Sequence, residues 1–92
     1  MKTIWKFVLN PNKVFIEMPA NAEILIAKEQ KDDICVWALV DLDSTAEKET
    51  RCFEVFGTGH VIKEDIGIKR KYIGTASMQE SCLILHVFER VT

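Results

Sequence analysis

The chain has 92 residues, of which 48% are hydrophobic and 28% are charged, and its formal net charge is −2. This length suits a single β domain spanning 1–92, and apolar residues along the whole chain exclude disorder as the main state. The slightly acidic balance disfavours a protein that tracks duplex nucleic acid, and no apolar run approaches the roughly 18 residues that cross a bilayer.

The first half of the chain alternates between apolar and polar residues with a period of two, which indicates β-strands. The first strand is predicted at 2–9, with one face formed by Thr3, Trp5, Phe7 and Leu9. Asn10-Pro11-Asn12 has turn chemistry and a second strand follows at 13–18, so a hairpin is the simplest connection. Further strands are predicted at 23–28 and 34–41, and the latter is apolar on both faces, which is typical of a central strand.

The second half continues this pattern after a polar stretch. Residues 43–50 form either a loop or one helical turn, and strands are predicted at 51–56, 72–78 and 81–89. The pattern predicts a mainly β fold, a small antiparallel sandwich or barrel of about seven strands, with one short helical turn at most in 43–50 or 60–68. The expected core includes Trp37, Leu39, Phe53, Val55, Leu83, Leu85 and Val87.

The three cysteines, Cys35, Cys52 and Cys82, are widely spaced and form no CxxC pair. We therefore expect reduced, mostly buried thiols, neither a disulfide framework nor a zinc site. Only Cys52 has a cation beside it, Arg51, as a reactive thiolate requires. The N-terminal residues lack the pattern of a cleaved signal, so a cytoplasmic location is expected.

Gly57-Thr58-Gly59-His60 is the most conspicuous local motif. Two glycines let the backbone turn sharply and approach a ligand closely, and successive N–H groups in such a turn can bind an anion. Thr58 and His60 would add side-chain donors, which suits a phosphate or a ribose. The alternative interpretation is a tight strand exit that carries a surface histidine.

A basic run, Lys69-Arg70-Lys71, precedes Tyr72 and gives a small basic and aromatic patch that suits one or two phosphates. Trp5 and Trp37 are either core residues or a platform on which a base stacks, and the sequence leaves both interpretations open.

No catalytic residue, metal or cofactor is predicted. His86 lies on a strand face with apolar neighbours, which is typical of a partly buried, hydrogen-bonded histidine. No Ser-His-Asp or Cys-His set can be assigned by spacing. Asp41 and Asp43 offer two carboxylates, but the further ligands of a metal loop are missing.

Several blocks of the sequence resemble a family of small phage and prophage proteins of uncharacterised function. The blocks are Met1-Lys2-Thr3-Ile4-Trp5-Lys6-Phe7, Ile16-Glu17-Met18-Pro19, Trp37-Ala38-Leu39-Val40-Asp41, Phe56-Gly57-Thr58-Gly59-His60, Tyr72-Ile73-Gly74-Thr75 and His86-Val87-Phe88-Glu89. The resemblance implies a phage-encoded protein in the host cytoplasm. Small phage proteins are often host-interaction factors, and some hold nucleotide immune signals between subunits.

Three functions follow as hypotheses. The first is an accessory, counter-defence binding protein, a homo-oligomer that sequesters a nucleotide-type signal through Gly57–His60 and Lys69–Tyr72. The second is an inhibitor that docks on a host defence or replication enzyme through a sheet edge. The third is a small hydrolase that uses His60 or His86. A pocket at Gly59 and His60 would favour the first, and a flat apolar surface would favour the second.

Overall fold

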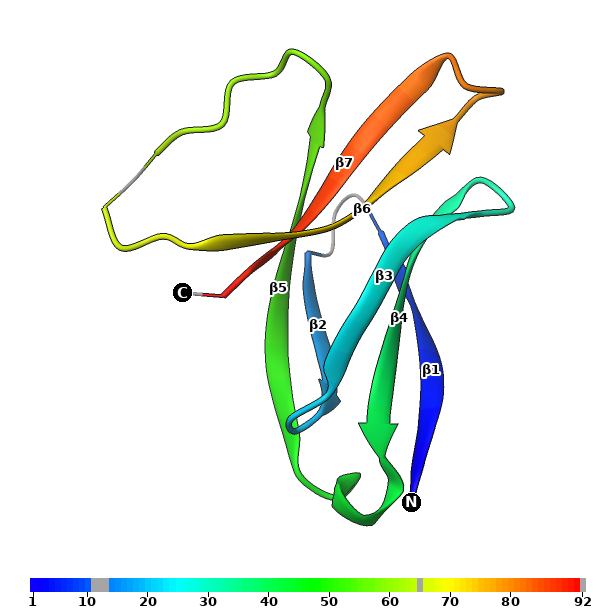
Figure 1. Cartoon of the computed structure of the whole chain (residues 1–92), viewed down its shortest axis with the longest axis vertical. Coiled ribbons are helices and arrows are strands. Elements are labelled where there is room, and N and C mark those ends of the chain that lie inside the picture. Colours follow the sequence, from blue (N-terminus) through cyan, green and yellow to red (C-terminus); the bar gives the residue numbers. More distant parts are fainter. Residues whose placement is uncertain (11–13, 65, 92) are drawn as a thin grey trace.

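The computed structural model describes residues 1–10, 14–64 and 66–91, and these residues form seven strands (Figure 1). Alternating apolar residues make each segment a strand because successive side chains point to opposite faces of a sheet. The mainly antiparallel β fold predicted from the sequence is confirmed. The strands are β1 (Lys2–Leu9), β2 (Phe15–Pro19), β3 (Glu23–Gln30), β4 (Asp33–Asp41), β5 (Lys48–Gly57), β6 (Arg70–Met78) and β7 (Leu83–Arg90).

The strands form two antiparallel sheets, in the order β1-β4-β3 and β2-β5-β7-β6. The predicted hairpin between the first two strands is therefore wrong, because β1 pairs with β4 along its whole length whereas β2 pairs with β5. The two strands belong to different sheets, and their residues Leu9 and Met18 meet in the core between the sheets. Of the predicted connecting turn, Pro11 and Asn12 lie outside the described residues, as does Lys13.

The sheets touch where β6 passes over β3. A Cβ atom added to Gly74 of β6 would lie 1.9 Å from the carbonyl oxygen of Ala27 in β3. Only a residue without a side chain allows two backbones to approach so closely. Both strands also shift register at this level, β3 between Ile24 and Ile26 and β6 between Tyr72 and Gly74. The glycine therefore fixes the junction between the two sheets.

The core lies between the inner faces of the two sheets. Phe53 and Val87 of the four-stranded sheet are fully buried, as predicted, and pack in one cluster with Val36 and Val40 of the three-stranded sheet. Glu89 is also buried on this inner face, opposite Phe53 in the register of β5 and β7. The Arg51 guanidinium compensates its charge with a hydrogen bond of 2.5 Å from Nε and another of 3.0 Å from Nη2.

Other residues assigned to the core lie elsewhere. Trp37 and Leu39 are only partly buried, because the alternate apolar residues of β4, such as Val36 and Val40, face the core instead. Trp37 is paired with Lys6, which faces outward. The strand is apolar on both faces, so its sequence does not say which set faces the core. Val55 and Leu83 remain 36% and 39% exposed.

The polar stretch after β4 contains a 3₁₀ turn at Leu42–Ser44, which is the single helical turn considered for this region. Asp41 caps it by accepting the backbone N–H of Asp43 at 2.9 Å. Among the described residues, no helix has the length and apolar character that a bilayer crossing requires. The expectation that the thiols are mostly buried holds for Cys35 but is wrong for Cys82, which is exposed in the turn before β7.

The segment between β5 and β6, described at 58–64 and 66–69 and here called the arm, extends away from both sheets on the left of Figure 1. The turns that join β6 to β7 and β3 to β4 lie on the opposite side of the molecule. The arm and these turns are therefore separated by the body of the domain.

Candidate functional site

The Gly57–His60 motif forms a tight turn at the end of β5. The His60 N–H donates to the Gly57 carbonyl at 3.1 Å, and Gly59 adopts a φ of 86°, a left-handed conformation that suits glycine. The imidazole of His60 folds back over Gly57, where an added Cβ would lie 2.8 Å from its Cε1 atom. One backbone donor of the proposed anion site is thus committed to the turn, and the three main hollows in the described part of the chain are lined by residues other than Gly57–His60.

The basic run before Tyr72 is divided between the two faces of the sheet, because neighbours on a strand point in opposite directions. Arg70 points outward, and its Nε donates to Oε1 of Glu54 at 2.8 Å. Lys71 is paired in register with the inward-facing Glu89 and lines a different hollow, beside β3. Lys69 is exposed. The structure therefore brings Arg70 and Tyr72 together and places Lys71 elsewhere.

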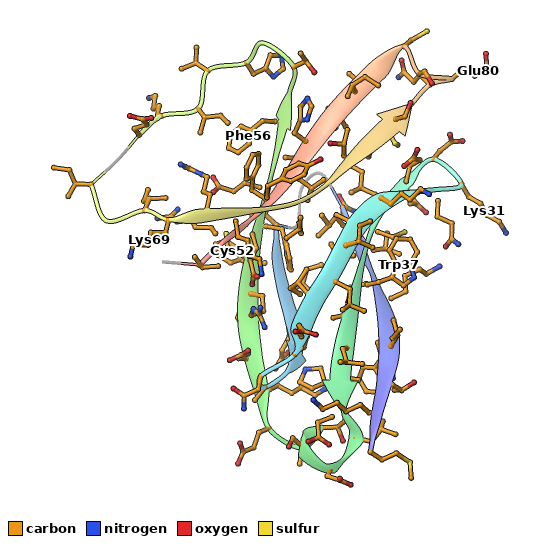
Figure 2. The ribbon with its side chains drawn as sticks, viewed as in Figure 1. Lys31, Trp37, Cys52, Phe56, Lys69 and Glu80 are labelled. Atoms are coloured by element: carbon orange, nitrogen blue, oxygen red, sulfur yellow. The ribbon has the colours of Figure 1, made fainter. Side chains whose placement is uncertain are left out.

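The outer face of the four-stranded sheet carries three aromatic rings in contact. The Phe88 ring centroid lies 5.9 Å from that of Phe56 and 5.5 Å from that of Tyr72, both in edge-on geometry. The Arg70 guanidinium lies 5.7 Å from the Phe56 centroid, a cation–π contact. We call Phe56, Arg70, Tyr72 and Phe88 the aromatic face; Figure 2 labels Phe56 on β5, beside the arm.

A chain of hydrogen bonds borders the aromatic face. Thr58 Oγ1 lies 2.7 Å from His86 Nε2, and His86 Nδ1 lies 3.4 Å from Thr75 Oγ1. The Thr75 hydroxyl in turn bonds the Tyr72 hydroxyl. The four groups come from β6, β7 and the turn after β5, and cross-strand register places Thr75 opposite His86.

This chain of four groups has one donor to spare. Three hydroxyls and a neutral imidazole carry four protons, whereas three hydrogen bonds use three. When all three bonds run in the same direction, the spare proton is at one end of the chain, on Thr58 or on Tyr72. A ligand at that end meets a donor whose orientation is set by neighbours on two strands.

Sequence reasoning identified Thr58, Arg70 and Tyr72 but missed the partners that complete the face. Phe56 and Phe88 were assigned no role, and His86 was correctly interpreted as a partly buried, hydrogen-bonded residue without a link to Thr58. The period-two pattern of β7 places His86 and Phe88 on the same face, which is the only signal in the sequence. Trp37 lies in the other sheet, so the aromatic ring available at this site is that of Tyr72, which is 54% exposed.

The thiol beside Arg51 does not have the environment of a nucleophile. Burial raises the pKa of Cys52, and the nearby Glu54 carboxylate raises it further. Arg51 itself is engaged by Glu89 on the other side of the strand. Among the described residues no three His, Cys, Asp or Glu side chains gather as a metal site would require.

The comparisons with known proteins give a family and nothing beyond it. The family model described as Domain of unknown function (DUF7352) matches residues 1–92, so the chain belongs to this family. Neither the curated proteins nor the solved structures contain a significant match.

Proposed function

We propose that the aromatic face and the adjoining hydrogen-bonded chain bind a nucleotide-type small molecule, which the protein sequesters without converting it. The observation that supports this most is the convergence of an exposed tyrosine ring, an arginine and an oriented hydroxyl–imidazole chain on one sheet face. Aromatic rings on an open sheet stack bases, and hydroxyl and imidazole groups suit a ribose or a phosphate.

The resemblance of the sequence to phage proteins extends the proposal to a biological role. A phage-encoded protein in the host cytoplasm that sequesters a nucleotide immune signal would act against host defence. In that role Tyr72 stacks the base, Thr58 or Tyr72 donates to the sugar or phosphate, and Lys69 supplies an exposed positive charge nearby.

Calorimetric titration tests the proposal with cyclic dinucleotides, ADP-ribose derivatives and mononucleotides. For whichever ligand binds, Tyr72→Leu should weaken binding by about 1–3 kcal/mol, because a stacked base loses its ring partner. Tyr72→Phe keeps the ring and should lose less. Trp37→Leu, on the other sheet, is the matched control and should bind as the wild type does. The proposal fails if no ligand of the panel gives heat, or if Tyr72→Leu binds as tightly as the wild type.

A second candidate function, inhibition of a host protein, is favoured by the outer face of the three-stranded sheet. Ile4, Val8 and Ile26 are 56%, 49% and 47% exposed there around the partly buried Trp37. An exposed apolar patch of this kind is typical of a protein contact. A partner that co-purifies with the wild type and with Tyr72→Leu, but is lost with Ile26→Asp, would support this alternative.

A hydrolytic function has less support. Thr58 and His86 have the spacing of a nucleophile and its base, but the partner of the other imidazole nitrogen is the Thr75 hydroxyl. In the Ser-His-Asp arrangement a carboxylate at that position stabilises the imidazolium that forms during attack. A neutral hydroxyl does not supply that charge, so the chain is better suited to holding a ligand than to removing a proton.

A further inference from the structure

An apolar groove of about 940 Å³ opens at one end of the domain, between the two sheets. Its walls include Leu9, Val55, Leu83 and Leu85, and two of these, Val55 and Leu83, leave more than a third of their surface exposed. Its lining includes three carboxylates: Asp32 in the turn between β3 and β4, Asp33 at the start of β4, and Glu80 in the turn between β6 and β7. The groove therefore combines apolar walls with an acidic rim.

The arm carries the complementary surface. Val61 is 86% exposed and Ile66 is fully exposed at 105%, so neither side chain packs on its own chain. Each limb of the arm has apolar residues followed by a lysine, Val61-Ile62-Lys63 and Ile66-Gly67-Ile68-Lys69, with Glu64 and Asp65 between the two limbs. Exposing apolar side chains to water costs free energy, and docking the arm onto another apolar surface removes this cost.

The arm is fastened to the sheet at its base. The Thr58 hydroxyl bonds His86 at one end, and the Val91 N–H donates to the Lys69 carbonyl at 2.9 Å at the other. The Arg70 guanidinium also donates from Nη1 to the Lys63 carbonyl at 3.2 Å, in the middle of the arm. These contacts hold the segment while Val61 and Ile66 remain exposed. Such pre-organisation lowers the entropy lost when the arm binds.

The groove and the arm cannot meet within one molecule. Figure 1 shows the arm on the left and the turns that form the groove rim on the right, and Figure 2 labels Lys69 and Glu80 on these two sides. A second copy of the chain carries a surface that matches the groove, because its arm presents exposed apolar side chains beside lysines.

We propose that the arm of one molecule inserts Val61 and Ile66 into the apolar groove of a second molecule, with Lys63 meeting a carboxylate on its rim. Each molecule then uses two different surfaces, one for each neighbour. A contact of this heterologous kind closes into a ring or extends into a chain. The proposal does not depend on whether the aromatic face binds a ligand.

Sedimentation over a wide range of protein concentrations tests the assembly. The wild type should associate as its concentration rises. Ile66→Asp disables the arm and Glu80→Lys reverses the charge at the groove rim, and each should weaken association about tenfold or more, because an apolar contact or a charge contact is lost. Leu83→Asp is a second groove variant. Leu42→Asp, at an exposed apolar residue of the 3₁₀ turn outside both surfaces, is the matched control and should associate as the wild type does.

Mixing two variants gives the decisive test. At a concentration where the wild type is just assembled, a head-to-tail contact predicts that Ile66→Asp and Leu83→Asp are each monomeric, whereas their equimolar mixture forms a dimer and nothing larger. The dimer forms because the intact arm of one variant meets the intact groove of the other. Circular dichroism confirms that the variants are folded, and Glu80→Lys, in an exposed turn, replaces Leu83→Asp if that variant is not. A wild type that stays monomeric, an Ile66→Asp variant that associates normally, or a mixture of folded variants that stays monomeric overturns the proposal.

Discussion

The buried ion pair between Arg51 and Glu89 gives a stability prediction that follows directly from the geometry. Glu89 is 4% exposed and accepts two hydrogen bonds from Arg51, whose remaining nitrogen donates to the Ala22 carbonyl at 2.8 Å and to Glu49 at 3.0 Å. The hydrogen bond to Glu89 raises the pKa of Arg51, while burial acts against it. The guanidinium therefore stays charged, and its carboxylate partner is nearly enclosed.

Arg51→Met removes the cation and leaves the Glu89 carboxylate buried without its partner. Breaking such a pair from one side costs about 3–5 kcal/mol. The double variant Arg51→Met with Glu89→Leu buries no charge, so it should recover most of this loss. Recovery stays incomplete because the Ala22 carbonyl still lacks its donor.

Urea unfolding followed by circular dichroism measures both variants and gives the free energy of unfolding from the transition midpoint and slope. Arg70→Met is the matched control, because the side chain of its partner Glu54 is 24% exposed and water can solvate the carboxylate; its loss should be smaller, about 1 kcal/mol. The reasoning is refuted if Arg51→Met costs no more than Arg70→Met, or if the double variant is as unstable as the single one.

Three further predictions concern the junction, the thiols and a strained turn. Gly74→Ala should cost about 3 kcal/mol or more in urea unfolding, because the added Cβ overlaps the Ala27 carbonyl; an unchanged midpoint would contradict the proposed contact. Alkylation at about pH 8 should modify the exposed Cys82 first and Cys35 last, since burial raises the pKa of Cys35 and keeps its thiol protonated to higher pH; peptide mass spectrometry reads the order, and early labelling of Cys35 would count against its burial. Glu80→Gly should stabilise the fold by about 1 kcal/mol in thermal unfolding, because Glu80 has a φ of 54° that glycine adopts without strain; destabilisation would show that its side chain contributes more than its backbone costs.

The strands were predictable from the sequence because their signal is local. A period of two marks each strand whatever it pairs with, and Gly, Asn and charged residues mark most of the turns between them. Pairing is not local. The simplest hairpin joined 2–9 to 13–18, but β1 matches Lys2 with Asp41 and Leu9 with Ile34 across the chain. Turn residues at 10–12 predict a change of chain direction, but they do not determine which strand the next segment pairs with.

The choice of buried face failed at β4 for a related reason. Ile34 and Val36 face the core while Trp37 faces outward, and both sets are apolar. A large aromatic side chain is usually assigned to the core because it buries the most area. On β4 the small and branched residues face the core instead, and the large ring that fills this core is Phe53 of β5.

The candidate site was predictable only in part. Glycine and threonine at 57–59 stood out because a tight turn needs them, and Tyr72 stood out beside basic residues. His86 and Thr75 reach Thr58 through the pairing of β6 with β7, which no local pattern encodes. The face therefore emerges from strand order and register.

The binding of a nucleotide-type ligand on the aromatic face is tested most directly by mapping amide chemical shifts in ¹H–¹⁵N spectra as the ligand panel is added. The account predicts shifts for residues 54–58, 70–75 and 86–88, which surround Tyr72, with the amides of β1 and β4 unchanged. Shifts confined to the three-stranded sheet, or no shift with any ligand of the panel, would contradict it.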